Sequence, residues 1–476
     1  MNRNLFVSAL TGSILLAGCA VGPNYHRPDT NPPAAYRDQT APADAKSLAD
    51  VGWWDIYRDP QLKALINAAL ADGFDARIAA ARVEQSRALA AEARGQLFPG
   101  VGYQANADRG RNALLGNAYT QGNGSIANGF DGYLGLAWEV DVWGRVRRLN
   151  EAARAEYLAS EEGRRGVLLG LVSEVATAYF ELLELDAQLA ITHREADSFG
   201  DTLHLFQQRL EGGIASRLET ASAEAARASS VARIPEIERQ IALKENQISV
   251  LIGHNPGSIA RATSLEDQLL PPEIPAGIPS QLLERRPDVR AAEDEARAAN
   301  AGIGATIGSF LPRIGLSALF GAVSSDLNDI TSRKAGLWSI GARVDGPLFQ
   351  GGGLTGQYDA AKARWDEARL RYQQTALNAF AEVAGALLSR QKLAEVRAQQ
   401  AVAVHAFDEA VKVATQRYAA GSAGYYEVLQ AQQQLYPAEL SLAQARANEL
   451  LIVVQLYRAL GGGWNLADAA AWSAPR

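Results

Sequence analysis

Apolar and polar residues alternate with a period of two in four short stretches of the chain, at about 99–109, 130–142, 313–322 and 337–348. This period is typical of a β-strand that has one apolar face and one polar face. We therefore predict four strands. Their apolar faces carry Val101, Tyr103, Ala105 and Ala107; Phe130, Leu134, Leu136, Trp138, Val140 and Val142; Ile314, Leu316, Ala318 and Phe320; and Trp338, Ile340, Ala342 and Val344.

Strands of this kind suit two environments. Transmembrane β-strands have ~9–11 residues, with apolar side chains toward lipid and polar ones toward a water-filled interior. A half-buried sheet of a soluble protein gives the same period. The strands by themselves leave both possibilities open.

A second spacing, of about 3.5 residues, predicts long coiling helices. No proline interrupts the chain from about Arg145 to Leu210, and a similar stretch covers about 356–418, although Arg390 and Arg397 interrupt its apolar seam. At 1.5 Å per residue such a helix is about 100 Å long, and a sustained 3.5 period implies packing against neighbouring helices. The first seam is Leu168, Val175, Leu182, Leu189, Ala196, Leu203 and Leu210, with Leu171, Ala178, Leu185, Thr192, Phe199 and Phe206 three residues on.

The whole arrangement occurs twice. Glu174-Val175-Ala176 matches Glu382-Val383-Ala384, and Gly213 matches Gly421, where each long helix is expected to end in a turn before a second long helix returns. Each copy predicts a helix, two strands and a hairpin of long helices. The expected segments are a signal peptide at 1–18, an extended segment at 19–59, copy one at 60–253 with its hairpin at about 145–253, a proline-rich linker at 254–286, copy two at 287–462 with its hairpin at about 354–462, and a tail at 463–476.

The N-terminus carries a targeting signal. An apolar run from Leu5 to Leu16 follows Arg3 and is too short to span a bilayer as a helix, which takes ~20 residues. It ends in Leu16-Ala17-Gly18-Cys19, which resembles a bacterial lipobox. We expect cleavage before Cys19, the only cysteine of the chain, followed by S-diacylglycerol and N-acyl modification. No later stretch has 18 unbroken apolar residues, so we expect no transmembrane helix.

Composition and motifs argue against several functions. The net charge of −7 is scattered, with no basic stripe for nucleic acid. The five histidines are dispersed and no phosphate-binding Gly-Lys-Ser/Thr loop occurs, so we expect no metal, no cofactor and no enzymatic activity. Gly302, Gly304 and Gly308 have the wrong spacing for a dinucleotide fingerprint, which favours close helix packing instead. The energy for any transport is expected to come from partner proteins.

The strands also predict an oligomer if they lie in a membrane. Four strands cannot close a barrel, and an open sheet edge is not tolerated in lipid. Two chains would give eight strands, whose interior is filled by side chains, whereas three chains would give twelve and leave room for water. A channel therefore favours a trimer.

Several segments resemble the TolC-like outer-membrane factors, in particular the lipoprotein branch of drug-efflux systems known as the NodT type. They span nearly the whole mature chain: Cys19-Ala20-Val21-Gly22-Pro23-Asn24-Tyr25, Trp53-Trp54 with Asp59-Pro60-Gln61-Leu62, Leu282-Leu283-Glu284-Arg285-Arg286-Pro287-Asp288-Val289, Tyr418-Ala419-Ala420-Gly421, and Val428-Leu429-Gln430-Ala431-Gln432.

The resemblance implies an α+β membrane protein: a homotrimer with a twelve-stranded transmembrane β-barrel, four strands per chain, continued by a long periplasmic α-helical barrel. It further implies an outer-membrane exit duct of a tripartite efflux system. The partners would be a periplasmic adaptor and an inner-membrane transporter of the resistance-nodulation-division class, together with outer-membrane lipid. Two alternatives stay open, namely the duct of a type I protein-secretion system and a structural periplasmic coiled-coil lipoprotein without a pore.

The resemblance also implies a constriction at the periplasmic tip, formed by a bulky residue and an acidic residue one helical turn later. In this chain the bulky position falls on Tyr426 and the acidic one on Gln430, and Gln433 stands where a basic partner is expected. The chain therefore departs from the family pattern at two positions. The copy-one equivalents of Tyr426 and Gln430 are Leu218 and Ser222, and the carboxylates that remain nearby are Glu219 and Glu427.

Overall fold

The computed structural model describes residues 20–37, 51–111, 126–214, 216–269, 277 and 279–462. Cys19, the expected signal peptide and the expected tail at 463–476 lie outside these residues. The chain divides into two compact units. The first comprises Met1–Asp29, Arg82–Glu161 and Ala291–Gln373, and the second comprises Thr30–Ala81, Glu162–Arg290 and Gln374–Arg476.

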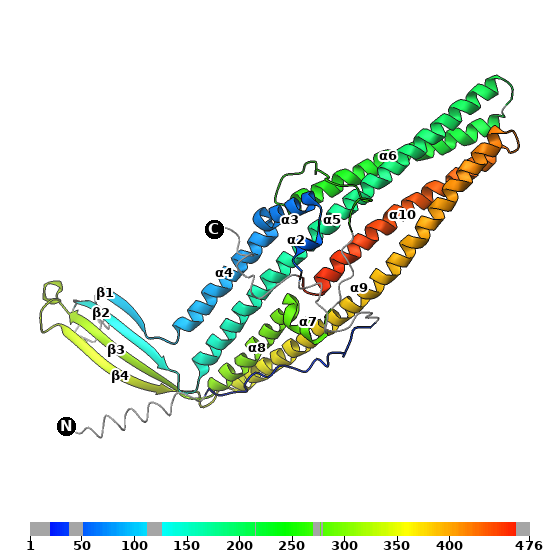
Figure 1. Cartoon of the computed structure of the whole chain (residues 1–476). Helices are drawn as coiled ribbons and strands as arrows, with labels where there is room; N and C mark the ends of the chain where they lie inside the picture. Colours follow the sequence, from blue (N-terminus) through cyan, green and yellow to red (C-terminus); the bar gives the residue numbers. More distant parts are fainter. Residues whose placement is uncertain are drawn as a thin grey trace. The chain divides into compact units, whose positions relative to one another are not determined.

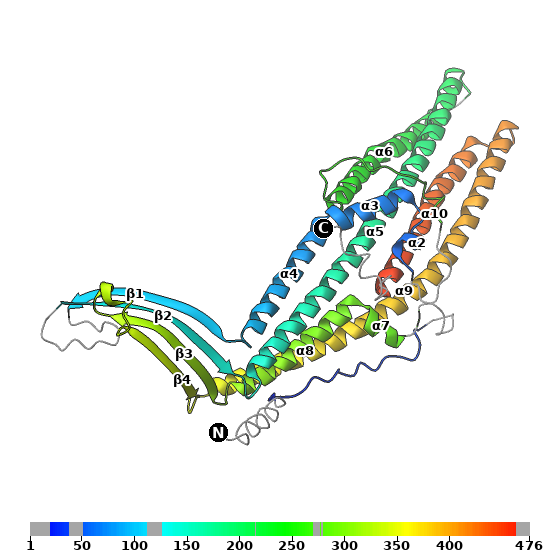
Figure 2. The ribbon, with the colours of Figure 1, turned by 60° about the vertical axis from the view of Figure 1, so that its left-hand side comes forward.

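The first unit contains one antiparallel sheet of four strands in the order β1-β2-β3-β4. The strands lie side by side and bend together (Figures 1 and 2). Their bounds are β1 Gly100–Arg111, β2 Ile126–Val140, β3 Arg313–Ser324 and β4 Gly336–Asp345.

The four strands that the alternation predicts are therefore present, with shifted ends. The second strand ends at Val140 and not at Val142. The reason is that Asp141 caps the following helix: its carboxylate accepts hydrogen bonds from the backbone N–H groups of Val146 (3.0 Å) and Arg147 (2.8 Å). A side chain that satisfies otherwise unpaired N–H groups at a helix start takes its residue out of the strand.

The internal repeat of the sequence is also a repeat of structure. α4 (Phe74–Gly95) and α8 (Pro287–Gly308) precede the two strand pairs, and both bounds of α8 are those of α4 moved by 213 residues. After the strands the shift is 208. It relates α5 (Arg145–Glu211) to α9 (Gly353–Ala419), and α6 (Arg217–Leu251) to α10 (Tyr425–Ala459).

The long helices α5 and α9 have 67 residues each. Both end where the sequence predicts, next to a glycine with positive φ, Gly213 at 71° and Gly421 at 73°. Only glycine adopts this backbone conformation without steric cost. Most of the predicted seam of α5 is buried, including Val175, Leu182 and Phe199, whereas Leu210 at its end is exposed.

Among the described residues, α5 is the one helix that is long and apolar enough to cross a membrane. Its most apolar 18-residue window has a mean hydropathy of 1.5, and 67% of that window is buried inside the protein. Burial of this kind is the expected consequence of the packed seam.

Shorter helices occupy parts of the second unit that the sequence predicts to be extended or a linker. α2 (Trp53–Ile56) lies within 19–59, and α7 (Pro279–Arg285) lies within 254–286. Pro279 occupies the first position of α7, where its fixed φ favours a helix and its missing N–H costs nothing. A proline count alone therefore misjudged the linker.

Asp59 connects α3 (Pro60–Asp72) to the rest of the second unit. Its carboxylate caps α3 by accepting from Gln61 N (2.8 Å) and Leu62 N (3.0 Å). The same carboxylate accepts from Tyr179 Oη on α5 (3.1 Å), from Thr263 Oγ1 (2.6 Å) and from Gln268 Nε2 (2.8 Å). These bonds give the buried charge five donors.

The N-terminal segment 20–29 is held against the first unit by close backbone packing. Gly22 has φ +98°, and a Cβ there would lie 2.4 Å from Gly304 Cα. A Cβ at Gly304 would lie 2.7 Å from Val21 O, and one at Gly308 would lie 2.8 Å from Arg145 Cβ. The packing role predicted for these glycines is thus confirmed at Gly304 and Gly308. At Gly302 there is open space.

Arg27 and Arg148 add polar ties to the same segment. The Arg27 guanidinium donates to Glu293 on α8 (2.9 and 2.5 Å), and Arg148 Nη2 donates to Asn24 Oδ1 (3.0 Å). Val21 N donates to Trp143 O (2.9 Å), just after the end of β2. The chain two residues after Cys19 is therefore tied to the junction of β2 and α5.

Candidate functional site

One face of the sheet is apolar across all four strands. Val101 pairs with Leu136, Leu136 with Ala318, and Ala318 with Ile340, so these residues form one row across the sheet. A second row consists of Tyr103, Leu134, Phe320 and Trp338. Since paired residues share a face, the faces predicted strand by strand coincide in the folded sheet.

These apolar side chains are exposed in the single chain. Ile340 is 81% exposed and Trp338 is 73% exposed. Exposed apolar surface of this extent marks an interaction site rather than an ordinary protein surface.

The opposite face is mainly polar or lacks side chains. The row next to that of Leu136 consists of Gly102, Gly135, Leu319 and Ser339, in which Leu319 is the exception. Further along the strands, Tyr133 Oη donates to Gln104 Oε1 (2.7 Å), and Asn106 Nδ2 donates to Asp131 Oδ2 (3.1 Å). The sheet thus separates an apolar side from a side that suits water.

A second region of interest is the end of the two helix hairpins in the second unit, where the sequence places the constriction. Tyr426, in the first turn of α10, is 74% exposed, and its copy-one equivalent Leu218 is 77% exposed. Gln430 and Gln433 are exposed as well. In the single chain the expected bulky residues are therefore free to contact other molecules.

The two carboxylates near this constriction are engaged. Glu219 Oε2 accepts from the backbone N–H of Ser216 (2.8 Å), while Ser216 Oγ accepts from Glu219 N (3.3 Å), so the pair caps α6. Glu427 pairs with Arg417 at 2.7 Å. Within the single chain both carboxylates have partners other than a bound cation.

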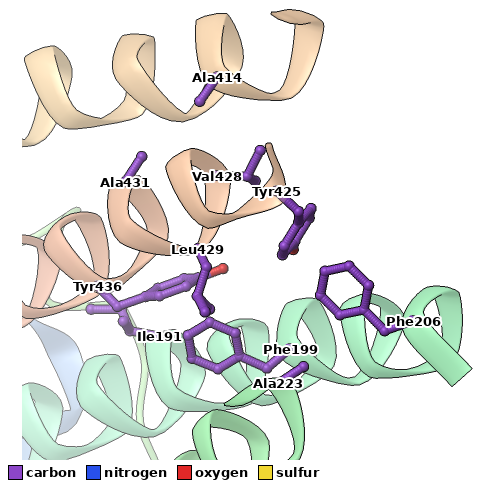
Figure 3. Packing of buried hydrophobic residues seen from close by; sticks show 10 residues of the cluster. All are labelled: Ile191, Phe199, Phe206, Ala223, Ala414, Tyr425, Val428, Leu429, Ala431 and Tyr436. Carbon is purple, nitrogen blue, oxygen red and sulfur yellow. The ribbon is translucent and has the colours of Figure 1, made fainter. Parts of the chain in front are cut away.

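Directly beneath Tyr426, a cluster of buried residues joins the two hairpins (Figure 3). Tyr425 and Phe206 meet edge to face, with ring centroids 4.5 Å apart, and Phe199 meets Tyr436 in the same way at 5.8 Å. Edge-to-face pairs stabilise by ~0.5–1.5 kcal/mol beyond their burial. Ile191, Ala223, Ala414, Val428, Leu429 and Ala431 complete the cluster.

Hydrogen bonds accompany this cluster. Tyr425 Oη bonds to Thr202 Oγ1, and Gln432 Nε2 donates to Ser198 Oγ (3.0 Å). Burial raises the pKa of Tyr425, so its hydroxyl stays protonated. Arg209 also donates to Tyr418 Oη across the two hairpins.

The sequence predicts only part of this junction. Phe199 and Phe206 appear in the seam of α5, but nothing in the pattern singles out Thr202 or Tyr425. Their signal is weak because Tyr425 and Tyr426 are identical neighbours, and only the helix start decides which of them is buried.

The described residues contain no cluster of three or more His, Cys, Asp or Glu side chains that could hold a metal ion. His193 and His204 are both exposed on α5.

Comparison with known proteins gives consistent matches. The family model described as outer membrane efflux protein matches residues 65–254 and 278–462. The probable efflux pump outer membrane protein TtgC of one strain of Pseudomonas putida is 34% identical over 472 residues, which cover 98% of this chain and 96% of that protein. The toluene efflux pump outer membrane protein TtgC of another Pseudomonas putida strain is 33% identical, with coverage of 98% and 96%.

Among solved structures, the open state of the MtrE outer membrane channel of Neisseria gonorrhoeae aligns with a TM-score of 0.85. The identity is 29%, and the alignment covers 94% of this chain and 98% of that one.

Proposed function

The chain belongs to the outer membrane efflux protein family, and from this premise we propose that three copies form the outer-membrane exit duct of a tripartite efflux pump. The observation that carries the proposal is the sheet. All four strands present one exposed apolar face and one polar face, in a register that keeps the two sides separate. Lipid on one side and water on the other fit this separation.

The trimer follows from the sheet edges. Within the described residues β1 pairs only with β2, and β4 pairs only with β3, so each copy offers two free edges. In lipid every backbone polar group must be satisfied, which closure of a twelve-stranded barrel achieves. Three copies also leave an interior wide enough for water.

In this account the sheets lie in the outer membrane and the helical part lies in the periplasm. The duct itself is passive. A periplasmic adaptor and an inner-membrane transporter of the resistance-nodulation-division class supply selection and energy. The substrates are small molecules, in keeping with relatives whose names refer to efflux pumps and, in one case, to toluene.

We propose that Tyr426 and Leu218 narrow the periplasmic end of this duct. Both are exposed apolar side chains at equivalent places of the two hairpins. Rings of apolar residues can close a pore by excluding water. With Gln430 uncharged and Glu427 paired to Arg417, this end should bind divalent cations weakly.

Lipidation of Cys19 is part of the proposal. The nearby residue Val21 is tied to Trp143 just beyond β2, so acyl chains on Cys19 would start near the strand ends. Three acyl chains together with a barrel should anchor the protein firmly. We expect mass spectrometry of the mature N-terminus to find triacylated Cys19, and Cys19→Ala to lose the lipid while still forming trimers. An uncut or unmodified Cys19 contradicts this expectation.

The duct of a type I protein-secretion system is the second candidate, because it would need the same barrel. The segment Val21-Gly22-Pro23-Asn24-Tyr25 and the lipobox resemble the efflux branch and favour the first candidate.

Efflux by intact cells tests the proposal. A strain lacking this chain should accumulate a fluorescent dye such as ethidium, and a plasmid copy of the parent should restore efflux. If the deletion leaves dye efflux unchanged but abolishes export of a polypeptide, the secretion duct is the correct function.

A further inference from the structure

The two free edges of the sheet carry a further inference, which rests on the trimer proposed above. We infer that β4 of one copy pairs with β1 of the next so that Ala342 lies opposite Ala107. The ladder then runs from Leu348 opposite Val101 to Trp338 opposite Arg111.

The internal repeat supplies this register. Gly100 pairs with Ala137 in the first strand pair, and Arg313 pairs with Asp345 in the second, so the two pairs have the same register after shifts of 213 and 208 residues. The junction of β2 with β3 is therefore an internal copy of the junction between β4 and the neighbouring β1.

Carrying one junction onto the other fixes the pairs. Val140 pairs with Ile314 at one end of the β2–β3 ladder, and Phe130 pairs with Ser324 at the other. Applying the same shifts turns Val140 into Leu348 and Ile314 into Val101. The other end becomes Trp338 with Arg111.

The end of β4 supports the same register independently. β2 has partners on both sides and continues to Val140, whereas β4 stops at Asp345, three residues before the equivalent Leu348. Leu348 is fully exposed, at 105%, and Phe349 is 89% exposed. A neighbouring strand would continue β4 through these residues and cover Leu348 with Val101, itself exposed on the apolar face.

Other registers conflict with the sheet. A shift by one residue would turn the apolar face of the neighbouring copy toward water. A shift by two keeps the faces but breaks the regular stagger. Moving straight across the sheet from Gly100 reaches Ser317, four residues beyond Arg313, the counterpart of Gly100. Only the inferred register gives the same four-residue stagger at all six strand pairs of the barrel.

Disulfide cross-linking tests the register, because Cys19 is the only cysteine of the chain. Directly opposite Cβ atoms lie ~4.5–5.5 Å apart and diagonal neighbours ~7–8 Å, while a disulfide needs Cβ atoms ~3.5–4.5 Å apart. Ala107→Cys/Ala342→Cys should therefore migrate mainly as a covalent trimer on a non-reducing denaturing gel, and the parent as a monomer.

Two variants shifted by two residues are the matched controls: Ala105→Cys/Ala342→Cys and Ala107→Cys/Val344→Cys. Both should give several-fold less covalent trimer than the inferred pair. Val101→Cys/Leu348→Cys should cross-link as well, which reports the extension of β4.

Stronger cross-linking in either shifted variant overturns the register and leaves the trimer intact. If every pair fails to cross-link in the membrane and the parent has a monomer mass under native conditions, the trimer itself is wrong.

Discussion

At the scale of single residues, two adjacent tyrosines have opposite surroundings. Tyr425 is buried against Phe206 and bonded to Thr202, whereas Tyr426 is exposed at the start of α10. The first joins the two hairpins, and the second is available to narrow a pore. Their different roles follow from where α10 begins.

Tyr426→Ala should raise the single-channel conductance of the reconstituted protein, because three rings near the axis would be replaced by methyl groups. Tyr426→Phe keeps the rings and should leave the conductance close to that of the parent. Equal conductance of the parent and the alanine variant places the constriction elsewhere.

Asp59 is a residue whose role is structural. Burial acts to raise its pKa, but hydrogen bonds from Thr263, the Leu62 backbone, Gln268 and Tyr179 outweigh burial and hold the pKa below its ordinary value. A carboxyl with a lowered pKa stabilises the fold above its unfolded-state pKa, and this contribution is lost as the pH falls through the folded-state value.

Asp59→Ala orphans several buried donors and should destabilise the fold by about 2–4 kcal/mol. We expect a lower midpoint of thermal unfolding at pH 7, with the difference from the parent shrinking as the pH falls below about 4. Asp72→Asn, an exposed change at the end of the same helix, is the control and should have little effect. A pH-independent difference would show that the charge of Asp59 is not what matters.

At the scale of elements, the two periods of the sequence predict the strands, the long helices and the repeat. The faces of the strands are confirmed by the register. The details that the sequence misses are local: Asp141 ends β2 early, and Pro279 begins a helix within the expected linker. Both depend on hydrogen bonds or backbone angles at one residue, which a pattern averaged over many residues does not contain.

The two sides of the sheet should respond differently to arginine. Leu136→Arg or Ile340→Arg puts a charge on the apolar face, which costs about 2–4 kcal/mol at the bilayer midplane, and should reduce the amount of trimer in outer-membrane fractions. Gly135→Arg or Ser339→Arg lies one row away on the other face and should leave assembly intact while changing the conductance. Identical behaviour of the two pairs would refute the assignment of the faces.

At the scale of the whole molecule, the account concerns an assembly of three copies. The resemblance of scattered segments predicts the family, and the comparisons confirm it. The interface between copies was only partly predictable. The sequence shows that four strands need partners, but the shifts of 213 and 208 residues that set the register emerge from the element bounds and pairings.

Single-channel recording of the purified protein in a planar bilayer tests the central claim most directly. The account predicts discrete conductance steps from a trimeric preparation, altered in Gly135→Arg and larger in Tyr426→Ala. A preparation shown to be trimeric and inserted in the bilayer that gives no steps, in the parent or in Tyr426→Ala, would contradict the claim that the chain forms a duct.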